Sequence, residues 1–259
     1  KNLGADDPPC HRDVVPCTPP IFGPRFPIPL AEPDIPQVPM CGRYTMASPE
    51  EWIREEFDLQ ALPEGFRPRY NIAPTQDVLA VVEGPEGPRA GWLRWGLIPS
   101  WAKDESIGNK LINARSETLA EKPSFRAAFA RRRCLLVADG FYEWMKADDT
   151  KVPMYVRRRS GRPFAFAGLW ERWRSADGGS VVSCTIVTTQ ACDEIAHIHP
   201  RMPVILAPEA RATWLDPHAT PERLSALLGP YDAGDLEAYA VSTLVNSPAN
   251  DVPECREPV

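Results

Sequence analysis

Hydrophobic and polar residues change their pattern abruptly at residue 40 of this chain. Before it, prolines recur every few residues and no period of 2 or 3.6 is visible. After it, short apolar or alternating runs bounded by turn residues are typical of strands. These runs predict strands over residues 78–82, 90–96, 134–138, 141–145, 154–158, 164–169, 181–188, 204–207 and 239–244.

Helix signals are fewer and shorter than the strand signals. Ser48-Pro49-Glu50-Glu51 has the form of a capping box with proline at the first helical position, and it predicts a helix ending near Phe57. Further helices are predicted from a Ser124 cap to about residue 133, and over 192–198, 208–215 and 221–228. The lack of regular alternation between strands and helices argues against a doubly wound sheet. We expect a β-rich α+β domain with barrel-like mixed sheets, mostly antiparallel, and short peripheral helices.

Composition divides the chain into three parts. Residues 1–39 are predicted to be a disordered, proline-rich extension. Two interpretations of residues 1–39 stay open. The first is that they lie upstream of a translation start at Met40 and come from an over-long gene assignment or from a longer product. The second is that they are a genuine extended arm. Residues 40–246 are predicted to form the folded domain, and residues 247–259 a C-terminal tail.

Charge and cysteine content narrow the function classes. The formal net charge of −6 argues against a nucleic-acid binder with an even basic coat, but it leaves a local basic groove open. The seven cysteines include no C-x-x-C pair, so neither a disulfide framework nor a zinc knuckle is indicated, and Cys134 and Cys184 are interpreted as core residues. No apolar stretch approaches the ~18 residues of a membrane span. We expect a cytoplasmic protein in a reducing compartment.

The pair Met40-Cys41 at the junction carries the most distinctive chemistry. If translation starts at Met40, removal of that methionine leaves Cys41 as the first residue. An N-terminal cysteine carries an α-amine and a thiol on adjacent carbons, with ordinary pKa values of about 8 and about 8.5. Such a 1,2-aminothiol condenses with an aldehyde to a five-membered thiazolidine, which an internal cysteine cannot form.

Several polar residues stand in apolar surroundings further along the chain. Asn113 is either a turn residue or a site residue, and Glu143 lies between aromatic residues, where burial would raise its pKa and suit a general acid or base. His197 and His199 have no Asp, Glu or Cys at ligand spacing, so a metal site is not expected.

Six motifs in this order resemble one family, the SRAP proteins (SOS-response-associated peptidases, or abasic-site processing proteins). The likeness runs from Met40 to about Asn246. Its motifs are Met40-Cys41-Gly42-Arg43, Tyr70-Asn71-Ile72-Ala73-Pro74-Thr75-Gln76, Trp95-Gly96-Leu97-Ile98-Pro99-Ser100-Trp101, Asn113-Ala114-Arg115-Ser116-Glu117, Gly140-Phe141-Tyr142-Glu143-Trp144 and His199-Pro200-Arg201-Met202-Pro203.

The resemblance implies a protein that crosslinks itself to abasic sites in single-stranded DNA through a thiazolidine on Cys41. It matches Glu143 to a proton shuttle, His199 to an acid/base and Asn113 to a residue that holds the amine or the sugar. It also implies AP-lyase activity and self-cleavage before Cys41, action in the DNA damage response, and a monomer without metal or cofactor that is nucleoid-associated on DNA. The DNA-contacting residues are then expected to be Arg43, Asn71, Pro74, Trp95, Trp101, Arg115 and Arg201.

Some of these assignments have alternatives. Trp95 and Trp101 either stack on bases or pack in the core, and Arg131-Arg132-Arg133 is interpreted as a solvated helix end rather than a DNA contact. At the level of function, a cysteine-dependent peptidase or amidohydrolase using Cys41, Glu143 and His199 remains open. So does a non-catalytic reader of modified DNA.

Overall fold

The structure is a computed structural model that describes residues 42–148, 150–231 and 234–259. The strands in this part of the chain are β1 (Arg43–Met46), β2 (Arg69–Ile72), β3 (Asp77–Gly84), β4 (Gly87–Trp95), β5 (Asn113–Arg115), β6 (Arg133–Ala138), β7 (Gly140–Ala147), β8 (Thr150–Arg158), β9 (Phe164–Arg174), β10 (Ser180–Gln190), β11 (Arg201–Pro203), β12 (Ile205–Leu206) and β13 (Leu236–Ala240). The α-helices are α1 (Glu50–Phe57), α2 (Arg126–Arg131), α3 (Pro208–Leu215) and α4 (Pro221–Ser225). Short 3-10 helices are η1 (Glu105–Lys110), η2 (Ser116–Thr118), η3 (Thr243–Asn246) and η4 (Pro253–Arg256).

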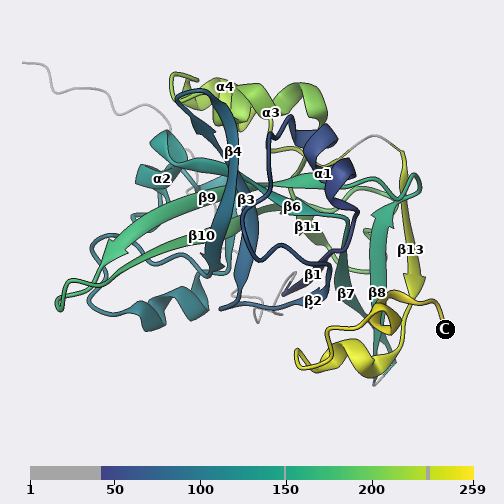
Figure 1. Ribbon diagram of the computed structural model, residues 1–259. Coiled ribbons are helices and arrows are strands. Elements are labelled where there is room, and N and C mark those ends of the chain that lie inside the picture. The colour runs from purple at the N-terminus through teal and green to yellow at the C-terminus, as the bar shows by residue number, and fades with distance from the viewer. Residues whose placement is uncertain (1–41, 149, 232–233) are drawn as a thin grey trace, which may run out of the picture. The chain divides into compact units, whose positions relative to one another are not determined.

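Five strands close into a barrel (Figure 1). The ring runs β10-β4-β3-β6-β9 and returns to β10, with β10–β4 as its parallel pair and the other pairs antiparallel. Closure leaves the ring without a free edge, which removes the usual site of unwanted strand pairing. The predicted β-rich α+β fold with barrel-like mixed sheets is therefore confirmed.

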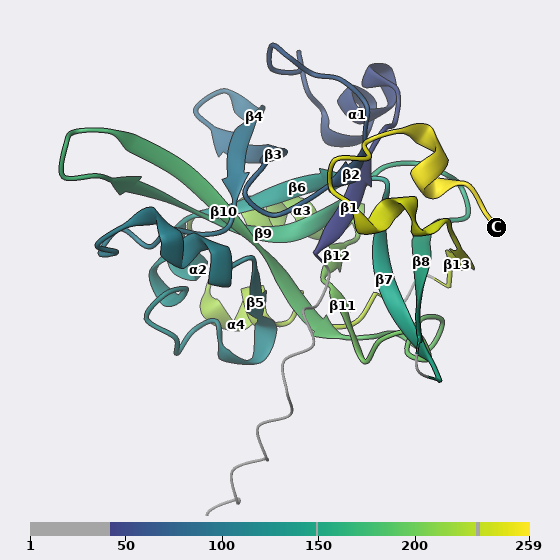
Figure 2. The ribbon, with the colours of Figure 1, turned by 90° about the horizontal axis from the view of Figure 1, so that it is seen from below.

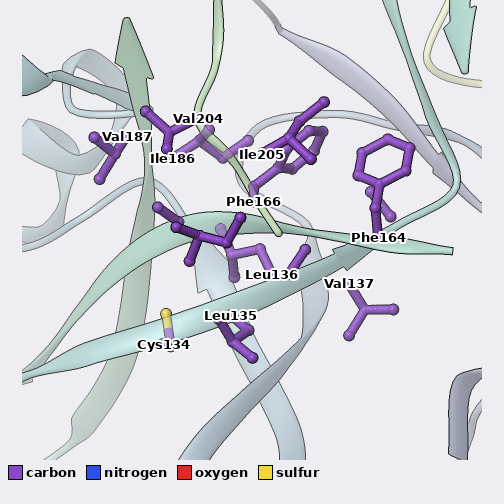
Figure 3. Packing of buried hydrophobic residues seen from close by; sticks show 14 of the residues in the cluster. Cys134, Leu135, Leu136, Val137, Phe164, Phe166, Ile186, Val187, Val204 and Ile205 are labelled. Carbon is purple, nitrogen blue, oxygen red and sulfur yellow. The ribbon is translucent and has the colours of Figure 1, made fainter. Parts of the chain in front are cut away.

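Alternating side chains of the barrel strands fill its interior, as Figure 3 shows for Leu136, Phe166 and Ile186. The strands approach so closely here that a Cβ on Gly168 would lie 2.7 Å from the Cys134 sulfur. Cys134 and Cys184 are fully buried, which confirms them as core residues. Burial raises the pKa of both thiols, so they stay protonated at neutral pH.

A second, antiparallel sheet of five strands, ordered β13-β8-β7-β1-β2, lies beside the barrel. Because neighbouring strand residues point to opposite faces, Tyr44 and Phe141 pack into the main core, while Tyr142 and Tyr155 face the other way. That second face is covered by the C-terminal segment, residues 241–258, which lies across the strands in Figure 2.

Residues 247–259 pack closely on this sheet. Cys255 of η4 is fully buried, and Val241 and Pro258 form an isolated β-bridge. The main chain of Tyr70 donates a 2.6 Å hydrogen bond to Asp251 Oδ1. These contacts join residues 247–259 to the predicted 40–246 domain, whereas residues 1–39 lie outside the described part.

Helix boundaries follow tertiary contacts where local signals and packing compete. Helix α3 covers the predicted 208–215, and α1 ends at Phe57 as expected. The predicted capping box is wrong, because Pro49 is the cap residue and Ser48 Oγ donates instead to Asp139 Oδ2 at 3.0 Å. The Ser124 cap is wrong as well, since α2 begins after Phe125 without a side-chain cap.

Residues 192–198, predicted as a helix, form successive turns. The pairing of Gln190 with Arg201 and the bond from Ala191 N–H to the Pro200 carbonyl close this segment as a loop between β10 and β11. Residues 243–244, predicted as the end of the 239–244 strand, belong instead to η3.

Candidate active site

A cavity of about 540 Å³ opens between the barrel and the second sheet. It is lined by Gly42, Arg43, Pro74, Ile112, Glu143, Trp144, Lys151, His199 and Asn246. Segments far apart in the sequence thus meet here, and they include four of the predicted site residues. Cys41 lies outside the described residues, and its neighbour Gly42 lines the cavity.

The end of β10 positions two of the segments that reach the cavity. Strand β5 pairs in parallel with β10, with Asn113 opposite Ile186, and β11 pairs antiparallel with it, with Arg201 opposite Gln190. In Figure 2, β5 and β11 lie on the two sides of β10. The loop before β11 contributes His199 to the cavity, and Ile112, next to the half-buried Asn113, lines it from the β5 side.

The carboxyl group of Glu143 is the acidic group among the cavity-lining residues. Its residue is 2% exposed and lies on β7, opposite Met154 of β8. A buried carboxyl that faces a cavity is suited to exchanging protons with a bound molecule. The predicted position of Glu143 in a site is compatible with this geometry.

His199 is half-buried, and its Nδ1 lies 3.1 Å from both the backbone nitrogen and the backbone oxygen of Arg201. Burial lowers the pKa of the imidazole; the hydrogen bond to the Arg201 backbone opposes this, and the charges of Arg201 and Lys151 add to it. The net lowering keeps His199 neutral at pH 7, so the ring has one nitrogen that accepts a proton and one that donates. His197 is exposed and is not among the residues that line the cavity.

Arg43 is held by the C-terminal segment. Its Nη1 donates to the Val245 carbonyl at 2.6 Å and to Asn71 Oδ1 at 3.2 Å, and its Nη2 donates to the Asn246 carbonyl at 3.3 Å. The guanidinium therefore lies at the cavity with its orientation fixed by protein groups. If Arg43 contacts a phosphate, it does so through the guanidinium N–H groups that these three bonds leave unused.

Asn71, predicted to contact DNA, is fully buried. Its amide nitrogen donates to the carbonyls of Val245, Ser247 and Asn250 at 3.2, 2.9 and 2.8 Å. Direct contact with DNA is therefore wrong for Asn71 in this structure. The residue anchors the C-terminal segment instead.

Trp95 and Trp101, which begin and end the third of the six motifs, differ in burial. Trp95 is fully buried, its indole N–H donates to the Ile112 carbonyl at 2.9 Å, and it packs edge-on against Tyr44. The base-stacking interpretation of Trp95 is therefore wrong, because a core residue has no free face for a base. Trp101 is 58% exposed and keeps an open ring surface.

The predicted DNA-contacting residues Arg115 and Arg201 also differ in their surroundings. Arg115 is exposed, whereas the Arg201 guanidinium makes a two-point ion pair with Glu117. The expectation of a solvated helix end is wrong for Arg133, which is 4% exposed and donates to the carbonyls of Phe129 and Trp214.

Five of the nine cavity-lining residues were not among the predicted site residues: Gly42, Ile112, Trp144, Lys151 and Asn246. Trp144 follows Glu143 directly, and its indole N–H donates to Asn246 Oδ1 at 2.8 Å. The aromatic run around Glu143 was a signal for Trp144. Lys151 and Asn246 stand in ordinary polar contexts, and only the fold brings them here.

The described residues contain no group of three or more His, Cys, Asp or Glu side chains placed to hold a metal ion. None of the helices described is both long and apolar enough to span a bilayer.

The sequence family that matches this chain is the SOS response associated peptidase (SRAP) family, over residues 40–248. The chain belongs to the SRAP family. Its SRAP region contains every predicted site residue, from Cys41 to Arg201.

Relatives of this SRAP protein share most of its length. It is 52% identical over 222 residues to the abasic site processing protein YoqW of Bacillus subtilis, which covers 84% of this chain and 99% of that protein. It is 31% identical over 242 residues to the abasic site processing protein HMCES of Gallus gallus, covering 81% of this chain and 69% of that protein. A crystal structure of a Bacteroides thetaiotaomicron protein matches with a TM-score of 0.76 at 25% identity, over 85% of this chain and 100% of that one.

Proposed function

We propose that this SRAP protein processes abasic sites in single-stranded DNA by forming a covalent crosslink through Cys41. The observation that carries the proposal is the cavity, where Gly42, the residue after Cys41, meets the buried carboxyl of Glu143 and the imidazole of His199. The relatives named abasic site processing proteins support the same class of substrate.

The proposed reaction joins an aldehyde to the 1,2-aminothiol of Cys41. An abasic sugar opens to expose an aldehyde at C1′. The α-amine, freed by loss of Met40, adds to this carbon, and the resulting carbinolamine loses water to give an imine. The thiol then adds to the imine carbon and its proton moves to the nitrogen, which closes a thiazolidine. The sum is one water released and no change of oxidation state.

Glu143 and His199 would move the protons of these steps. The carboxylate of Glu143 takes a proton from the ammonium of Cys41 and returns it to the departing hydroxyl group. The neutral imidazole of His199 offers both a donor and an acceptor for opening the sugar ring. Asn113, half-buried beside the cavity-lining Ile112, would hold the amine or the sugar by hydrogen bonds.

DNA would be held by groups that line the cavity and by exposed groups elsewhere in the same motifs. Arg43 lines the cavity and Arg115 is exposed, and guanidinium groups bind phosphates well. The exposed ring of Trp101 is available to stack on a base next to the lesion, and Pro74 lines the cavity where such a base would enter. Arg201, whose guanidinium is paired with Glu117, would add to the attraction between these groups and the phosphates.

Two further activities belong to the proposal. An imine at C1′ acidifies the proton on C2′, so β-elimination of the 3′ phosphate gives AP-lyase activity. Cleavage of the Met40-Cys41 bond by the protein itself would give the SRAP peptidase activity and free the amine that the crosslink needs.

The test is the formation of a denaturation-resistant adduct between protein beginning at Cys41 and an abasic single-stranded oligonucleotide. We expect an adduct with the wild type, none with Cys41→Ala, and slower formation with Glu143→Gln. The matched controls are an oligonucleotide whose aldehyde is capped with methoxyamine and a protein in which Met40 is retained. Adduct formation by Cys41→Ala would overturn the proposal, and intact binding without any adduct would favour the non-catalytic reader.

A cysteine hydrolase is separated from this proposal by its substrate. It would cleave peptide or amide substrates, and the Cys41→Ala variant would be inactive toward them. It would give no stable adduct with abasic DNA. Release of amide products in the absence of an adduct would therefore support the hydrolase.

A further inference from the structure

The ion pair between Glu117 and Arg201 connects two segments of the site. Arg201 Nη1 lies 2.8 Å from Glu117 Oε1, and Nη2 lies 3.0 Å from Oε2. Nη2 also donates to the Thr188 carbonyl at 2.9 Å. The Arg201 side chain is 16% exposed and the Glu117 side chain is 48% exposed, so the pair is partly open to solvent, but its two-point geometry fixes its direction better than that of an ordinary surface ion pair.

The backbone of the same arginine holds His199. The Nδ1 atom of His199 lies 3.1 Å from both the amide nitrogen and the carbonyl oxygen of Arg201. Because only one residue separates them, the imidazole and the guanidinium belong to one short segment. A contact that restrains the guanidinium therefore adds to the β10–β11 pairing that holds this backbone, on which the orientation of the imidazole depends.

Glu117 belongs to the opposite side of β10. It lies in η2, directly after β5, which carries Asn113. Thr188 of β10 is the midpoint: it pairs with Arg115 of β5 and with Pro203 of β11. The ion pair thus crosses over β10 and ties the Asn113 segment to the His199 segment.

We propose that Glu117 is a positioning residue of the SRAP site: by holding Arg201, it fixes His199 in the orientation that the reaction needs. The inference rests on the proposed crosslinking function. It assigns the carboxylate of Glu117 no contact with DNA, and its effect is transmitted through Arg201.

A competing explanation makes a different prediction. Glu117 could act only as an anion that occupies Arg201 until a phosphate displaces it. Neutralising the carboxylate would then tighten binding to single-stranded DNA and leave the rate of crosslinking at saturating DNA unchanged. Under our proposal, the rate at saturating DNA falls, whether or not the change of charge beside Arg201 also alters the DNA concentration that gives half the maximal rate.

The experiment measures single-turnover crosslinking by protein beginning at Cys41, with an abasic oligonucleotide at limiting and saturating concentrations. Its variants are Glu117→Gln, His199→Ala and the double variant, with Arg201→Lys as a second way to break the two-point pair. Glu105→Gln is the matched control, because Glu105 makes a 2.7 Å ion pair with Arg94 and its side chain is 56% exposed.

We expect Glu117→Gln and Arg201→Lys to lower the rate at saturating DNA by about ten- to hundredfold, the range expected when a reacting group is misplaced by about 1 Å. In the His199→Ala background, Glu117→Gln should cause no further loss, since the two residues act as one unit. Additive losses, or an unchanged rate with tighter binding, would overturn the inference.

A second measurement does not depend on crosslinking. Nitrogen NMR of the His199 ring should show one tautomer in the wild type and in Glu105→Gln, and averaged tautomers in Glu117→Gln. Unchanged ring signals in Glu117→Gln would contradict the positioning role even if the wild type formed no adduct. A wild type without an adduct but with these NMR shifts would count against the proposed function alone.

Discussion

Replacing Asn71 by alanine tests how the C-terminal segment is anchored beside the cavity. The carboxamide is fully buried and contacts the carbonyls of Val245, Ser247 and Asn250 through its nitrogen. Its oxygen accepts a hydrogen bond from Arg43 at 3.2 Å. Asn71→Ala removes all of these bonds, and each of the three carbonyls is left with its one other donor: Arg43 for Val245, the Asn250 N–H for Ser247 and the Cys255 thiol for Asn250.

The expected loss of stability follows from the number and type of bonds. The two N–H groups contribute about 1 kcal/mol each, and the bond from the charged guanidinium contributes about 1.5–3 kcal/mol, for a total of about 3.5–5 kcal/mol. For a domain of this size, each kcal/mol corresponds to about 2–4 °C in Tm, so we expect Tm to fall by roughly 10 °C.

The assay is thermal unfolding followed by circular dichroism, together with adduct formation at a temperature where the variant remains folded. The matched control is Asn109→Ala, because Asn109 is exposed on η1. It should change Tm by less than about 1 °C, as substitutions on an open surface usually do.

The reasoning would be refuted by a Tm within about 2 °C of the wild type, because a buried carboxamide with these contacts must stabilise the fold. A variant of normal Tm that had lost DNA binding would restore the sequence-based prediction that Asn71 contacts DNA directly.

Three further substitutions have defined outcomes. In Gly140→Ala, the new Cβ would lie 2.2 Å from ring atoms of the buried Tyr155, so urea unfolding should show a loss of at least about 1–3 kcal/mol, while Gly91→Ala, with open space around it, should show little change. Burial raises the pKa of Asp251, but hydrogen bonds from Tyr70 N–H and Arg69 outweigh it and lower the pKa below the unfolded value. The stability that Asp251 contributes is therefore complete above about pH 4, and the gap between wild type and Asp251→Asn should close as pH falls below that value; a gap that widened in acid would contradict this sign. Trp101→Ala should weaken binding to single-stranded DNA by about 1–3 kcal/mol in a fluorescence titration at unchanged Tm, and unchanged binding would remove Trp101 from the interface.

Much of the fold could be predicted from local pattern. The strands of the barrel follow from short apolar runs between turn residues, and α3 follows from its proline start and its period. The closure of the barrel could not be predicted in this way, because the parallel pairing of β4 with β10 joins segments about ninety residues apart. No local signal records such a pairing.

In the candidate site, the sequence indicated which residues have suitable chemistry, but it did not indicate which of them are buried. Glu143 and His199 were identified by residue type and context, and they line one cavity. Trp95 and Asn71 carry side chains suited to DNA contact, yet both are buried, because their partners come from distant segments. In each case the residue type indicated its possible interactions, and the fold decided which partner it found.

Ser48 illustrates how a local signal can be overridden. Its hydroxyl is correctly placed in sequence to cap α1, but the carboxylate of Asp139, 91 residues away, accepts from it and from Thr45 in a buried cluster. A hydrogen bond to a buried charge stabilises the protein more than a neutral cap does. The helix therefore begins without a side-chain cap.

The central claim is tested most directly by locating the crosslinked atom. Protein beginning at Cys41 is incubated with an abasic oligonucleotide, digested with protease and nuclease, and the sugar-bearing peptide is sequenced by mass spectrometry. The account predicts that the sugar is on the peptide that starts with Cys41, that the thiol of this residue resists alkylation, and that borohydride does not reduce the linkage. A sugar on Lys151 or another internal residue, or a Cys41 thiol that remains open to alkylation in the adduct, would contradict it.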